Sequence, residues 1–163
     1  MTHEHDPEVV ARSIVEANRF LALGTADRSG RPWVTPVWYA PLSYREYVWV
    51  SRPDTRHSRN VAERPHVAIT IYDSHRPGAW SALYMDAVAE QLEQVDEALE
   101  AFNRRSAAQA LRAWSRAEVL EPGEFRLYCA TATEQFVLDD HDRRIRVYDL
   151  QAHIPRASED GLH

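Results

Sequence analysis

Hydrophobic and polar positions alternate along most of this sequence with the two-residue period of a β-strand. Over residues 66–73, Val67, Ile69 and Ile71 alternate with Ala, Thr and Tyr, as expected for a strand with one buried face. Runs rich in β-branched and aromatic residues predict further strands over 19–26, 31–40, 46–51, 79–92, 124–138 and 144–150. Pro36 cannot donate to a sheet ladder, so the strand over 31–40 should contain a bulge or lie at an edge.

Two segments follow helical spacing instead. Asp6-Pro7-Glu8 is a helix start, with a capping carboxylate and a proline in the first turn, and an apolar stripe follows it as far as Ala17. Apolar residues at helical spacing from Val95 to Trp114 predict a helical insertion between two strands. The pattern as a whole predicts a mainly β fold: a barrel of six or seven antiparallel strands with an N-terminal helix and a helical insertion.

Composition narrows the possible function classes. The chain has 163 residues, the length of one domain, and a formal net charge of −6, and all 19 of its basic residues other than histidine are arginines. An acidic chain argues against general nucleic-acid binding, and no apolar run approaches the roughly 20 residues of a membrane span. The N-terminus lacks the pattern of a secretory signal, so a cytoplasmic protein is expected.

No metal site is expected either. Cys129 is the only cysteine, which excludes an internal disulfide framework and a cysteine-based zinc cluster. His3 and His5 have no evident third ligand.

The segment between the strands over 46–51 and 66–73 has the strongest chemical signal. Asp54 or Thr55 can cap a short helix from about Arg56 to Glu63, which Pro65 ends. The free N–H groups of such a helix would face the end of the preceding strand, where Ser51 offers a hydroxyl. Arg56 and His57 lie in the first helical turn, where cations are unfavourable, so the sequence indicates an external anion such as phosphate. The alternative is that Arg52, Arg56, Arg59 and Arg64 form a solvated face.

Two stretches, "FLALGTADRSGRPWVTPVWY" and "YVWVSRPDTRHSRNVAERPHVAITIYD", resemble the FMN-binding split-barrel family typified by pyridoxamine 5′-phosphate oxidase. The resemblance covers about residues 8–140 in order and spacing. It implies a Greek-key split barrel, present as a homodimer, in one domain over 1–163 with its core at about 8–140 and a C-terminal extension over 141–163.

The resemblance also implies a cofactor site. The matching positions for the FMN phosphate are Ser51, Thr55, Arg56 and His57, with His57 in place of the common lysine; Val50 and Asn60 are assigned to the same site. The flavin ring would lie along Pro36, Val37 and Trp38, and Trp80, Ser81 and Ala82 would approach it from the partner side. The glutamine that biosynthetic oxidases carry near Ala82 is absent.

We therefore expect an FMN-binding oxidoreductase acting on an unidentified small molecule. The chain ends "IPRASEDGLH" and lacks the Arg-x-His segment that grips pyridoxal phosphate in the oxidases, so pyridoxamine oxidation is not expected. The alternatives are a deazaflavin-dependent reductase, for which this chain offers few cations, and a non-catalytic flavin- or haem-binding module. No general base stands out, and Trp114 and Arg116 are candidates to line a substrate pocket or to reach a neighbouring flavin.

Overall fold

A computed structural model describes residues 5–148 of the chain. Its helices are α1 (Pro7–Ala17), α2 (Arg56–Glu63), α3 (Asp96–Ala108) and α4 (Arg116–Val119). Its strands are β1 (Phe20–Ala26), β2 (Pro32–Trp38), β3 (Ala40–Pro41), β4 (Glu46–Ser51), β5 (His66–Tyr72), β6 (Ala82–Gln91), β7 (Arg126–Leu138) and β8 (Arg144–Arg146). Each expected strand has a counterpart, so the mainly β prediction is confirmed.

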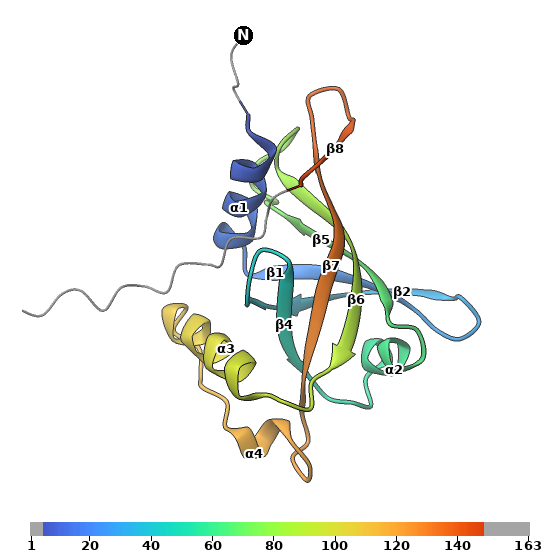
Figure 1. Cartoon of the computed structure of the whole chain (residues 1–163), viewed down its shortest axis with the longest axis vertical. Helices are drawn as coiled ribbons and strands as arrows, with labels where there is room; N and C mark the ends of the chain where they lie inside the picture. Colours follow the sequence, from blue (N-terminus) through green and yellow to red (C-terminus); the bar gives the residue numbers. More distant parts are fainter. Residues whose placement is uncertain (1–4, 149–163) are drawn as a thin grey trace, which may run out of the picture.

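The strands form one antiparallel sheet with the order β2-β1-β5-β6-β7-β4-β3, and β8 pairs with β7. Strands β2 and β3 lie at opposite ends of this order, although only Tyr39 separates them in the chain. The sheet therefore curls into a half-barrel (Figure 1). Pro36 lies in β2, at one end of the sheet, which confirms the edge position expected from its missing N–H.

Two hydrophobic clusters stabilise this arrangement. The larger lies inside the curl, where side chains such as Leu21, Ile69 and Leu83 meet the buried face of α1. The smaller lies between α3 and the strands β4 and β7, and it includes Leu99, Phe102 and Leu127. Helix α3 is thereby fixed on the outside of the curl, next to the end of β2.

Two non-glycine residues in the left-handed region of backbone space, Trp80 and Ala110, account for part of the difference between expected and observed elements. The strand expected over 79–92 begins only at Ala82, because Trp80 has φ 60° and interrupts the extended backbone. The helix expected to continue to Trp114 ends at Ala108, because Ala110 has φ 57°. The strand expected over 144–150 is seen as β8, and positions 149–150 lie outside the described residues.

The end of α3 is a Schellman motif. The N–H of Leu111 donates to the carbonyl of Ser106 at 2.8 Å, and the N–H of Ala110 donates to that of Ala107 at 3.1 Å. This turn redirects the chain, and Trp114 follows in an irregular segment before α4. Within residues 5–148, no helix is long and apolar enough to cross a membrane.

Candidate functional site

Helix α2 begins where the sequence predicts, and Thr55 rather than Asp54 caps it. The Thr55 hydroxyl oxygen accepts a hydrogen bond from the N–H of Ser58 at 3.3 Å, and the helix ends at Glu63 before Pro65. The first turn of an α-helix leaves N–H groups without partners inside the helix and carries a partial positive charge. This end of α2 lies beside the end of β4.

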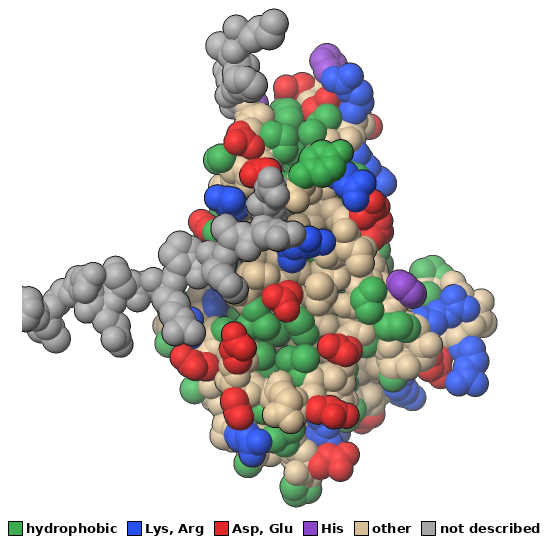
Figure 2. Space-filling view, viewed as in Figure 1, with side chains coloured by type: hydrophobic (Ala, Val, Ile, Leu, Met, Phe, Trp, Pro, Cys, Tyr) green, Lys and Arg blue, Asp and Glu red, His purple; other side chains and the backbone are tan. Residues whose placement is uncertain are grey.

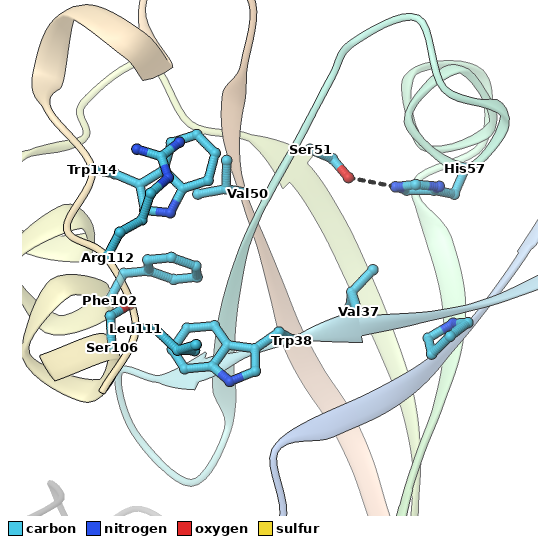
Figure 3. Close-up of a pocket in the computed structure, with 11 residues that line it drawn as sticks. Val37, Trp38, Val50, Ser51, His57, Phe102, Ser106, Leu111, Arg112 and Trp114 are labelled. Carbon is cyan, nitrogen blue, oxygen red and sulfur yellow. Dashed lines mark hydrogen bonds between the residues drawn. The ribbon is translucent and has the colours of Figure 1, made fainter. Parts of the chain in front are cut away.

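Ser51 and His57 connect these two elements directly. Ser51 Oγ lies 2.6 Å from His57 Nε2 (Figure 3). Thr55 Oγ1 lies 3.3 Å from the same nitrogen. The imidazole is about half buried, and this burial lowers the pKa of His57 below its ordinary value. The free protein therefore holds His57 mainly uncharged at neutral pH, and an anion placed beside it would favour the imidazolium.

The four arginines of this segment are not equivalent. Arg52 pairs with Asp54, and the Nη2 atoms of Arg59 and Arg64 donate to the carbonyls of Asp54 and Arg28. Arg56 instead lies over the ring of Trp33, with its guanidinium carbon 4.4 Å from the ring centroid.

The guanidinium of Arg56 has no hydrogen-bond or ion-pair partner among residues 5–148, unlike those of its three neighbours. Figure 2 shows further basic side chains at the tip of the β1–β2 hairpin, whose turn contains Arg28 and Arg31. Partners within the chain therefore account for Arg52, Arg59 and Arg64, whereas the hydrogen-bond donors of Arg56 stay available for an external anion.

A cavity of about 390 Å³ opens beside the Ser51–His57 pair. It lies between β2, β4, the start of α2 and the helical insertion. Its volume is within the range of small-molecule sites. Its lining comprises Pro36, Val37, Trp38, Val50, Ser51, His57, Phe102, Ser106, Leu111, Arg112 and Trp114. The first six of these are residues that the sequence assigned to a cofactor site.

The other predicted site residues lie outside this lining. Thr55 and Arg56 open the adjoining helix, whereas Asn60 is buried and donates from Nδ2 to Thr25 Oγ1 at 3.0 Å. Trp80 and Ser81 precede β6, and Ala82 is its first residue, paired with Tyr72. The structure of one chain therefore does not bring these last three together with the Ser51–His57 pair.

Four lining residues were missed by the sequence reasoning: Phe102, Ser106, Leu111 and Arg112. Phe102 and Ser106 are four residues apart on one face of α3, so helical spacing could have grouped them. Leu111 and Arg112 reach the cavity only because α3 ends early, which the apolar pattern does not signal. Trp114 does line the cavity, whereas Arg116 pairs with Asp96 at 3.0 Å on the surface.

One wall of the cavity is held in a fixed orientation. Trp38 donates from Nε1 to Gln109 Oε1 at 2.8 Å, and Phe102 meets the Trp38 ring edge-on at 4.8 Å between ring centroids.

Among residues 5–148, no group of three or more His, Cys, Asp or Glu side chains could hold a metal ion. His3 lies outside this range, and His5 stacks on Trp80.

Comparisons with known proteins identify the fold. Solved structures with the same fold include HutZ, described as the haem storage protein from Vibrio cholerae, with 22% identity, a TM-score of 0.62 and coverage of 82% of this chain and 95% of that one. A haem-binding protein from Mycobacterium smegmatis has 22% identity and a TM-score of 0.61, over 88% of this chain and 58% of that one. An F420 reductase has 17% identity and a TM-score of 0.59, with coverage of 76% of this chain and 94% of that one.

At these identities the structural matches establish the split-barrel fold alone. No curated protein matches the chain. The family model described as pyridoxamine 5′-phosphate oxidase matches residues 8–138, which is most of the sequence. This chain therefore belongs to the pyridoxamine 5′-phosphate oxidase family.

Proposed function

We propose that this protein binds FMN and acts as a flavin-dependent oxidoreductase on a small molecule. The observation that carries the proposal is the Thr55-capped start of α2 beside the Ser51–His57 pair, at one side of a cavity. Helix N-termini bind phosphate through free N–H groups and the helix dipole. Arg56, the arginine of this segment without a polar partner among the described residues, lies in the first turn.

These donors suit a phosphate monoester. Arg56 can donate two parallel hydrogen bonds to one phosphate, and the Ser51 hydroxyl and His57 add to them. The Thr55 hydroxyl already caps the helix, so we assign it a smaller share of the binding. Asn60 acts through its bond to Thr25, which holds α2 against β1.

Bound FMN would supply the electron transfer, and the chain supplies binding and orientation. Pro36, Val37, Trp38 and Val50 provide a mainly apolar surface for the flavin ring. Among residues 5–148, no carboxylate lines the cavity, and His57 is the one lining side chain of a type that titrates near neutral pH. No general base other than His57 stands out among these described residues, and bound FMN would supply the redox chemistry.

A homodimer is part of this proposal, in the cytoplasm expected from the sequence. Phe20 and Tyr72 lie on neighbouring strands and are 56% and 55% exposed, and Val34 is 65% exposed at the sheet edge. Such exposed apolar side chains favour a covering partner. A second copy would also supply the residues that one chain leaves away from the cavity: Trp80, Ser81 and Ala82 of the partner subunit.

The test compares FMN with riboflavin, which has the same ring and no phosphate. FMN should bind at least tenfold more tightly in a fluorescence-quenching titration. Arg56→Ala should weaken FMN binding at least tenfold, because about 1.5–3 kcal/mol is lost for each charge-assisted hydrogen bond, and should leave riboflavin binding unchanged. Arg64→Ala is the matched control and should change neither. Equal affinities for the two flavins would refute the phosphate site.

Haem is the second candidate, since two proteins of the same fold are described as binding or storing it. Of the described residues, His57 is the one histidine that lines the cavity, but its Nε2 is engaged with Ser51. The absorption spectrum of the purified protein separates the two cofactors, because haem gives a Soret band and flavin gives its own visible bands. A deazaflavin coenzyme, suggested by the F420 reductase of the same fold, should compete with FMN in the same titration.

A further inference from the structure

We propose that the half of the cavity built by the helical insertion binds the substrate, and that this substrate is a flat aromatic carboxylate. The inference rests on the proposed function in assigning the Ser51–His57 half to the cofactor. Figure 3 shows Ser51 and His57 on one side and Phe102, Leu111, Arg112 and Trp114 on the other, with Val37, Trp38 and Val50 between them.

The insertion half is shaped for a planar ring. Trp38, Phe102 and Trp114 present three aromatic side chains, and each is oriented by an edge-on aromatic neighbour: Trp38 and Phe102 by each other, and Trp114 by Phe125 at 4.8 Å. Leu111 adds an aliphatic contact that is 47% exposed. Aromatic rings bind well between such surfaces, through stacked or edge-on contacts and a large buried apolar area.

Arg112 gives this half its charge preference. Its guanidinium carbon lies 3.6 Å from the centroid of the Trp114 ring, and its Nη1 donates to Glu118 Oε1 at 3.0 Å. Among residues 5–148, its Nε and Nη2 atoms have no hydrogen-bond partner. This free edge matches the two oxygens of a carboxylate.

Glu118 fixes Arg112 more than it competes for it. The carboxylate of Glu118 also accepts hydrogen bonds from the N–H and the hydroxyl of Ser115, at 2.8 and 2.9 Å. The guanidinium is thereby held against Trp114 by a partner that is itself held in place. A carboxylate on the ligand would bind beside an oriented donor, while the ring supplies most of the contact area.

The test uses 2-naphthoate as the probe and 2-naphthalenemethanol as its uncharged counterpart. Calorimetric titrations are run on FMN-loaded protein and on cofactor-free protein, and FMN affinity is measured separately. We expect 2-naphthoate to bind at least fivefold more tightly than the alcohol. Arg112→Met, which keeps an apolar chain against Trp114, should abolish this preference and leave FMN affinity unchanged.

Two further variants complete the test. Leu111→Asp places a carboxylate on an exposed part of the wall and should weaken 2-naphthoate binding at least fivefold. Arg104→Met is the control, since Arg104 pairs with Glu100 on the solvent side of α3. Equal binding of the two probes, a loss in Arg104→Met as large as that in Arg112→Met, or displacement of FMN by 2-naphthoate would overturn the inference. If FMN does not bind at all, the proposed function fails, but the titrations of cofactor-free protein still show whether the insertion half of the cavity binds 2-naphthoate.

Discussion

Ser51 Oγ and His57 Nε2 lie 2.6 Å apart and join the last residue of β4 to the first turn of α2. The contact fixes the direction in which the free N–H groups of the helix point. It also makes the charge state of one imidazole a property of the candidate cofactor site. The pH dependence of that site therefore follows from His57.

FMN binding should depend on pH through His57. Burial lowers the pKa of His57, so this side chain is mainly uncharged at pH 8, and a nearby phosphate favours its protonated form as the pH falls. His57→Ala should therefore weaken FMN binding more at pH 6 than at pH 8, measured by flavin fluorescence quenching. His57→Lys restores a permanent charge and should bind FMN more tightly than the parent at pH 8. A ratio of parent to His57→Ala affinity that is the same at both pH values would contradict this role.

Folding stability should also record the lowered pKa of His57. The unfolded chain takes up a proton near the ordinary pKa of about 6.5, whereas the folded chain does so only at lower pH. The unfolded state therefore binds more protons, and the free energy of unfolding falls as the pH falls through 6.5. In urea denaturation at pH 7.5 and at pH 5.5, the free energy of unfolding should fall less between the two pH values in His57→Gln than in the parent. His66→Gln, at an exposed position on β5, should follow the parent.

Local signals allowed α2 and its surroundings to be predicted closely. Thr55 and Pro65 mark both ends of the helix, because capping and the missing proline N–H act within a few residues. Ser51 could be placed by the end of the strand pattern. The bounds of α2 and the end of β4, which flank the proposed phosphate site, could thus be predicted from the sequence.

The insertion half of the cavity could not be predicted in the same way. Ala110 takes a backbone conformation that usually needs glycine, so nothing in the sequence signals the end of α3 there. The positions of Leu111 and Arg112 depend on that turn and on the packing of α3 against β4 and β7. The contact between Asn60 and Thr25 spans 35 positions and likewise depends on the tertiary fold.

Asn60 should stabilise the fold through this contact. Both side chains are buried, and Asn60→Ala leaves the Thr25 hydroxyl without the amide donor, which should cost about 1–3 kcal/mol of unfolding free energy. Thr25→Val should have a similar effect. In urea denaturation the double variant should lose less than the sum of the two single losses, because both remove one interaction. Strict additivity would show that the two side chains act independently.

Substitutions at the turn that ends α3 test both the free energy of unfolding and the binding of 2-naphthoate in the cavity. Ala110 has φ 57°, a conformation that costs an L-residue about 1–2 kcal/mol and that glycine adopts freely. Part of that gain is offset by the greater freedom of glycine in the unfolded chain, so Ala110→Gly should raise the free energy of unfolding by about 0.5–1 kcal/mol. Ala107→Gly, three residues earlier on the exposed side of the helix, should instead lower it by up to about 1 kcal/mol. Because Ala110→Gly keeps the Schellman motif, binding of 2-naphthoate should be unchanged in that variant. If Ala110→Gly destabilised the protein as much as Ala107→Gly, α3 would continue past Ala108, and Leu111 and Arg112 would no longer be placed beside the cavity.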